Sequence, residues 1–286
     1  MTHSIFQTYP LEMEKVQTSA GEQPTPYHIY SAHGLLIAGT ADFDKVGRLL
    51  ENEQVYPVQT IAGKALMALW VIDGSEASHG AHTEFQVSFY VSHQPLAPAD
   101  DSPFALLKLL LTESHARQMC HGLWNNTPEV VAYNCEILGL TAKLVQSEFN
   151  RSGGRVTFSF RDSVNQELIA EGSIREMKRP PLSAGIALFR SLGVGQALRA
   201  AAMKVLTVRV VNPISDVLTN NVDALTASSS DSIVAQLFDS RHDQVRIANP
   251  IYAGLGFEPI FVEHMVGFKM VYLTPQATHE LNATQL

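Results

Sequence analysis

The sequence predicts an α+β fold built on antiparallel strands, and three observations support this prediction. Residues 83–91 alternate strictly between apolar and polar side chains, which is typical of a strand with one buried face. Residues 135–149 and 155–162 are joined by a turn that contains Gly153-Gly154, and so short a connection pairs two strands antiparallel. Helical periodicity is found only between groups of strands, which differs from the β-α-β alternation of a parallel sheet.

The length of 286 residues suits one large domain with a substantial core. The first 26 residues are polar and contain three prolines, so we expect residues 1–26 to form an extended arm. Residues 27–275 are expected to form a single domain, and residues 276–286 a C-terminal tail.

In the N-terminal half, residues 35–38 form a short apolar run that predicts a strand. Asp42 is a helix-capping residue before apolar positions at helical spacing. Residues 65–72 read as a buried strand. A helix is expected to begin at Ser102-Pro103 and to run to about Cys120, because leucines recur there at intervals of three and four.

In the C-terminal half, the predicted hairpin and a further strand at residues 167–177 make an antiparallel meander. Pro180-Pro181 ends it, and a helical pattern follows over residues 184–205. The last predicted strands cover residues 207–211, 260–264 and 268–273.

The charge pattern argues against several classes of protein. Only 17% of residues are charged, and the net charge is -8, so no basic surface for nucleic acid is expected. The longest apolar run, residues 65–72, is far shorter than a membrane span, and we expect a cytoplasmic protein. Cys120 and Cys135 do not have the spacing of a zinc site, and no cofactor is predicted.

Several landmarks together resemble the acetoacetate decarboxylase family. They are the segment 40–46 (Thr-Ala-Asp-Phe-Asp-Lys-Val), the pair Thr83-Glu84, the segment 122–128 (Gly-Leu-Trp-Asn-Asn-Thr-Pro) and the order of the strands over residues 135–177. The resemblance covers roughly residues 27–273. It implies a closed or strongly curved antiparallel sheet around an apolar pocket, with flanking helices, and it implies a homo-oligomer.

The resemblance also implies a chemistry that this sequence does not fully support. In the family, a lysine forms a Schiff base with the keto group, and an apolar pocket lowers the pKa of its amine. Two adjacent lysines follow a proline in that family, whereas Pro128 is followed here by Glu129 and Val130. The early pocket arginine has no counterpart apart from His33, and the first pocket glutamate is replaced near Leu69.

We therefore predict a protein that acts on a small oxo acid or related carbonyl compound by carboxylate acid/base chemistry. The predicted catalytic residues are Glu84 and Glu129. The predicted substrate-binding residues are Trp124, Asn126 and Gln86.

Five alternatives remain open from the sequence. Lys143 or Lys64 could replace the missing amine, or the protein could bind a small molecule without turnover. His79, His82 and Glu84 could hold a divalent metal, since two imidazoles and a carboxylate are a known ligand set. Glu84 could also lie on a solvated face, and residues 125–128 could simply form a turn.

Overall fold

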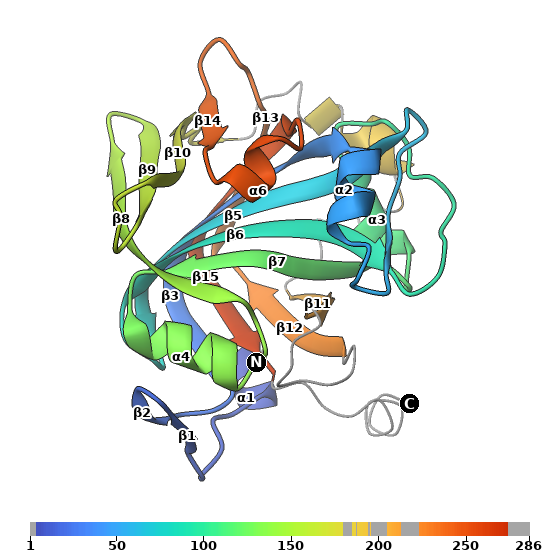
Figure 1. Ribbon diagram of the computed structural model, residues 1–286. Coiled ribbons are helices and arrows are strands. Elements are labelled where there is room, and N and C mark those ends of the chain that lie inside the picture. The colour runs from blue at the N-terminus through green and yellow to red at the C-terminus, as the bar shows by residue number, and fades with distance from the viewer. Residues whose placement is uncertain are drawn as a thin grey trace.

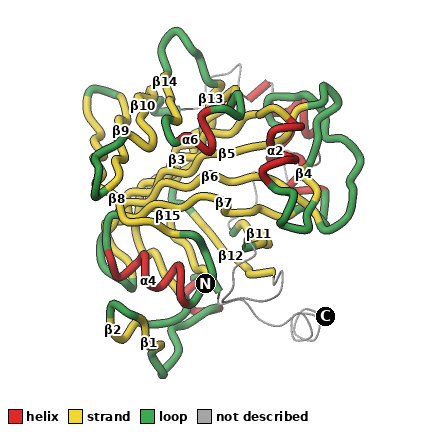
Figure 2. The backbone as a smooth tube through the Cα atoms, in the orientation of Figure 1, coloured by secondary structure: helices red, strands yellow, loops and turns green. Residues whose placement is uncertain are grey.

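The computed structural model describes residues 4–179, 185–186, 188–193, 195, 205–212 and 223–273. It contains a 13-stranded sheet and a two-stranded sheet, with short helices around them (Figures 1 and 2). The predicted α+β class is therefore confirmed.

Seven strands of the large sheet close into a barrel. In ring order they are β7 (Arg117–Asn125), β11 (Leu206–Val211), β12 (Asp223–Ser229), β15 (Glu258–Tyr272), β3 (Tyr27–Asp42), β5 (Lys64–Ala77) and β6 (His82–Ser92). Pairing of β6 with β7 closes the ring. The closed, strongly curved sheet is thus confirmed.

The barrel is mixed, which corrects the prediction of purely antiparallel strands. Strand β7 pairs parallel with β11 and, beyond the ring, parallel with β8 (Ala142–Ser152). Helix α4 (Pro128–Glu136) lies between β7 and β8 in the chain. It provides the crossover that two parallel strands need.

The remaining strands extend or cover the barrel. The sheet continues from β8 through β9 (Arg155–Asp162) and β10 (Leu168–Arg175) to β14 (Gln244–Ile247). The predicted hairpin between β8 and β9 is confirmed, and Gly153 and Gly154 both have positive φ in its turn. The other strands are β13 (Ser232–Leu237) on β15, β4 (Tyr56–Pro57) on β6, and the separate pair β1 (Val16–Thr18) and β2 (Gly21–Gln23).

Short helices lie at the ends and sides of the barrel. They are α1 (Ile5–Thr8), α2 (Phe43–Leu49), α3 (Ala105–Thr112), α4 and α6 (Pro250–Ala253). Asp42 caps α2 as predicted, because its Oδ1 accepts a hydrogen bond of 3.0 Å from the Lys45 amide. Helices α3 and α4 lie at opposite ends of the barrel (Figure 1).

The predicted helix ending near Cys120 is wrong in its second half. Helix α3 ends at Thr112, and Cys120 lies in the middle of the barrel strand β7. The register of β6 and β7 shifts between Val87 and Ser88, so His121 is an extra residue in β7. This bulge breaks the alternation of side chains that would have identified the strand.

Other elements also begin or end at residues different from those predicted. Cys135 lies in α4, since Pro128 begins a helix where Pro is favoured at the first turn. The predicted strand at 35–38 is the middle of β3, and those at 260–264 and 268–273 are one strand, β15. Much of the predicted helix 184–205 lies outside the described residues. In the described part of the chain, no helix has the length and hydropathy needed to cross a membrane.

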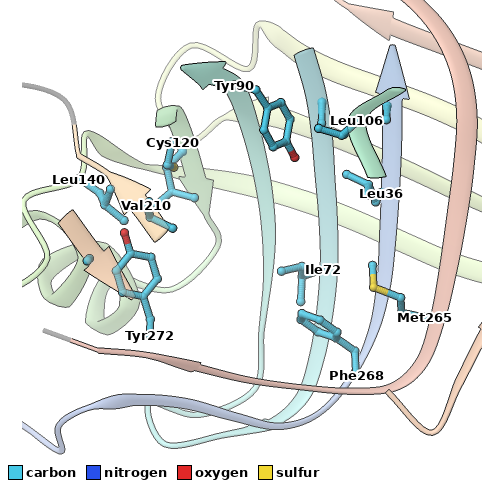
Figure 3. Packing of buried hydrophobic residues seen from close by; sticks show 14 of the residues in the cluster. Leu36, Ile72, Tyr90, Leu106, Cys120, Leu140, Val210, Met265, Phe268 and Tyr272 are labelled. Carbon is cyan, nitrogen blue, oxygen red and sulfur yellow. The ribbon is translucent and has the colours of Figure 1, made fainter. Parts of the chain in front are cut away.

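Apolar side chains lie on both faces of the barrel wall. Leu35, Ile37 and Val87 belong to a cluster on the outward face, under β8–β10 and α6. A second cluster faces the interior. In Figure 3, side chains from one part of the wall (Cys120, Val210, Tyr272) and from another (Leu36, Ile72, Phe268) point toward each other across the barrel.

The interior is less completely filled than the outward face. Trp70, Gln86 and Glu263 lie in mid-strand on the inward face, yet they are only half-buried. Their outward-facing neighbours Leu69 and Val87 are 0% exposed. Side chains on the inward face that are still accessible border space that protein atoms do not fill, and this space beside Trp70, Gln86 and Glu263 is called the void below.

Candidate functional site

Glu84 lies on the inward face of β6, near one end of the barrel. Its register partners are Ile72 on β5 and Asn125 on β7, and Ile72 belongs to the interior cluster. The flanking residue Phe85 points outward. Glu84 is only 4% exposed, so the solvated alternative from the sequence does not apply.

Two buried amides fix the Glu84 carboxyl group. The Asn125 side chain donates a hydrogen bond of 3.0 Å to Glu84 Oε2. Asn134, on α4, donates a bond of 3.0 Å to Asn125 Oδ1, so the helix orients the amide that holds the carboxyl. Burial raises the pKa of Glu84 to about 7, and the hydrogen bond from Asn125 opposes this rise.

Tyr27 and His82 form a hydrogen-bonded pair beside Glu84. His82 Nδ1 lies 2.9 Å from the Gly80 carbonyl oxygen, which can only accept, so Nδ1 carries the ring proton. His82 Nε2 therefore accepts from the Tyr27 hydroxyl. Burial raises the pKa of Tyr27 well above its usual value, and the charges of Glu84 and Tyr133 raise it further.

A row of polar side chains continues along the inward face from Glu84. Gln86 donates to the Ser88 hydroxyl, and Gln118 on β7 donates to the same hydroxyl at 3.2 Å. Ser88 is completely buried, whereas Gln86 borders the void. Polar donors therefore line part of the interior beside the buried carboxyl.

A second carboxyl, Glu263 on β15, also faces the interior. Its register partner on β3 is Leu36, which belongs to the interior cluster. Burial raises the pKa of Glu263 to about 7. Its charge adds to the burial that raises the pKa of Tyr90, while the Trp70 indole opposes that rise. No local pattern in the sequence identifies this residue as part of a site.

The other residues predicted from the sequence do not gather around Glu84. Trp124 lies on the outward face of β7, with its ring 5.4 Å from that of Phe85 and 5.8 Å from that of Tyr252. Asn126 accepts a hydrogen bond of 2.8 Å from the Thr83 amide at the end of β6. Glu129 is exposed in the first turn of α4, where the helix dipole stabilises a negative charge.

The histidines near Glu84 do not form a metal site with it. His82 is engaged by Tyr27 and Gly80, and His79 Nδ1 lies 2.8 Å from the Ser78 hydroxyl. Over the described ranges, no three His, Cys, Asp or Glu side chains are arranged to hold a metal ion.

The lysines considered as substitutes lie away from the void. Lys143 is exposed on β8. Lys64 lies at the other end of the barrel, 3.6 Å from Glu258, with 42% of its side chain exposed. None of the lysines that the structure describes is buried, although Lys204 lies outside the described residues.

A surface pocket of about 220 Å³ opens at the Lys64 end of the barrel. Its walls come from β3, β5, β15 and the start of α3, including Leu66, Leu106 and Phe261. Glu84 does not line this pocket. We therefore place the candidate site at the buried carboxyls and their polar neighbours rather than in the pocket.

No protein-family model matches the sequence, and a comparison with curated proteins finds no match either. Solved structures do match. The crystal structure of acetoacetate decarboxylase from Legionella pneumophila is 14% identical, with a TM-score of 0.56 over 96% of this chain and 95% of that one. A second acetoacetate decarboxylase structure is 11% identical, with a TM-score of 0.53 over 87% of each chain.

The chain has the acetoacetate decarboxylase fold. The resemblance noted from the sequence is confirmed at this level, since the fold covers nearly the whole chain. At such low identity the likeness concerns the fold alone. The chemistry that this acetoacetate decarboxylase fold supports here has to be argued from its own interior side chains.

Proposed function

We propose that this protein transfers protons on a small oxo acid or related carbonyl compound, with Glu84 as the acid/base residue and without a Schiff base. One observation carries the proposal: Glu84 is a buried carboxyl inside the barrel whose pKa is raised to about 7. Such a group can both take up and return a proton at neutral pH.

The arrangement of donors supports proton removal from the carbon next to a carbonyl group. Ionised Glu84 would take that proton while Asn125 keeps the carboxylate oriented. Gln86 is half-buried on the same face, and the amide hydrogen that it does not donate to Ser88 can bind the carbonyl oxygen, where negative charge develops. Of the residues predicted from the sequence, the proposal therefore keeps Glu84 and Gln86 as substrate contacts.

Hydrogen exchange tests the proposal directly. The protein would be incubated in D2O with acetoacetate or 2-oxobutanoate, and loss of the α-protons followed by NMR. We expect Glu84→Gln to slow this exchange by about 100-fold or more, the usual contribution of a positioned acid/base group. Glu171→Gln, a carboxyl change on β10 outside the barrel, is the matched control and should exchange like the wild type.

Borohydride trapping separates this proposal from lysine chemistry. Reduction in the presence of acetoacetate should leave no covalent adduct on the protein, as judged by intact mass. An adduct on any lysine, or unchanged exchange in Glu84→Gln, would contradict the proposal. Tight ligand binding without any exchange would instead favour a small-molecule-binding protein.

We also propose a homo-oligomer, which the family resemblance in the sequence suggested. Light scattering of the purified protein measures the mass in solution directly. A mass equal to the 31.4 kDa of one chain would contradict this part of the proposal.

A further inference from the structure

Glu263 lacks the partners that normally accompany an enclosed carboxyl group. It makes no hydrogen bond or ion pair with any described residue, although charged groups inside proteins are usually paired. It is half-buried on the inward face of β15, so part of the residue borders space that protein atoms do not fill. An unpaired carboxyl facing unfilled space is free to contact a bound molecule.

Glu263 and Glu84 lie on opposite walls of the barrel. In the closed ring, β6 and β15 are separated by β5 and β3 on one side and by β7, β11 and β12 on the other. No two strands of a seven-strand ring can be further apart. The two carboxyls therefore belong to opposite walls, and a small molecule between these walls would have one of them on each side.

The two carboxyls differ in what surrounds them. Asn125 donates a hydrogen bond to Glu84, and such a donor favours the ionised form. No comparable donor among the described residues reaches Glu263. Glu84 should therefore ionise first and act as the base, while Glu263 keeps its proton and acts as the acid.

We propose that Glu263 is a second catalytic residue, a general acid opposite Glu84, and that the substrate is a carbonyl compound with a hydroxyl group on its β-carbon. The inference rests on the proposed function of Glu84. It adds the leaving group and the residue that protonates it.

The proposed reaction is a dehydration. Glu84 takes the α-hydrogen as a proton, and the C–H electron pair forms an enolate. The enolate then forms a carbon–carbon double bond as the C–O bond to the β-hydroxyl breaks, and that oxygen takes the proton of Glu263 and leaves as water. An α,β-unsaturated carbonyl compound remains, with Glu84 protonated and Glu263 ionised, and exchange with solvent restores both groups.

The test uses 4-hydroxybutan-2-one and 4-hydroxy-2-oxobutanoate as probes, with α-proton exchange and loss of water followed separately by NMR in D2O. We expect Glu84→Gln to lose both reactions. Glu263→Gln should lose water elimination by about 100-fold or more, a far larger loss than any change in its α-proton exchange. Glu263→Asp, which retains an acid, should recover part of the elimination, and thermal melts would show that each variant is folded.

A change of leaving group distinguishes an acid from a structural residue. In 4-acetoxybutan-2-one the acetate leaves without being protonated, so Glu263→Gln should eliminate it as fast as the wild type does. Two outcomes would refute the role of Glu263 while leaving the proposed function of Glu84 intact, provided that exchange depends on Glu84. In the first, Glu263→Gln eliminates water at the wild-type rate. In the second, Glu263→Gln loses the elimination of water and the elimination of acetate equally. If the wild type shows no exchange, or if exchange does not depend on Glu84, the proposed function fails as well.

Discussion

Glu84→Gln is expected to stabilise the protein by about 3 kcal/mol above pH 7 and to leave its stability nearly unchanged below pH 4.5. The reason is that burial raises the pKa of Glu84 from 4.5 to about 7. Each unit of pKa shift corresponds to about 1.4 kcal/mol, which gives about 3 kcal/mol for this carboxyl. Glutamine has the shape of the protonated acid, keeps an acceptor for Asn125 and cannot ionise.

The direction of the pH dependence of stability is set by which state, folded or unfolded, binds the Glu84 proton. Between pH 4.5 and pH 7 the folded protein keeps the Glu84 proton, while the unfolded chain has lost it. Stability therefore falls as pH rises through this window and stays low above it. The variant lacks this group, so the difference between the two proteins grows from nearly zero to its full value over the same range.

Glu263→Gln should show the same trend, because its pKa is also raised from 4.5 to about 7. Water can enter the space that Glu263 borders, so we expect the smaller effect at this site. Chemical denaturation of both single variants, the double variant and Glu171→Gln across this pH range would measure the differences. A constant difference between Glu84→Gln and the wild type at all pH values would contradict the raised pKa.

The position of Glu84 could be predicted from local sequence because β6 is regular. Alternation over residues 83–91 places Phe85 and Val87 on one face and Glu84 and Gln86 on the other. The structure has this arrangement, with the apolar set pointing outward under β8–β10. Only closure of the sheet decides that the polar face is the interior.

Trp124 is predicted from the sequence to bind substrate but does not face the interior, because β7 is irregular. The extra residue at His121 shifts the alternation, so Trp124 points outward while Leu123 and Asn125 point inward. A bulge of this kind depends on the partner strand and leaves no signal in the residues of β7. Glu263 was missed for a related reason, since only the long-range pairing of β15 with β3 and β12 sets it opposite Glu84.

The close approach of β3 and β15, where Gly39 pairs with Pro259, predicts the second large change in stability. We expect Gly39→Ala to destabilise the protein by about 3 kcal/mol or more, the upper range for overpacking a well-packed site. A Cβ added to Gly39 would lie 2.1 Å from the Glu258 carbonyl oxygen and 2.8 Å from the Pro259 Cα atom. Both are backbone atoms, so the clash cannot be relieved by turning a side chain.

Gly47→Ala is the matched control for this substitution. A Cβ at Gly47 in α2 would meet no heavy atom within 4 Å, and alanine in a helix is more stable than glycine by about 1 kcal/mol. Denaturation curves should therefore move in opposite directions for the two variants.

Because Glu263 lies on β15 only a few residues after Glu258, a strand displaced by Gly39→Ala should also slow water elimination, whereas Gly47→Ala should not. Equal stability of the two variants would show that β3 and β15 are not packed as closely as the register requires.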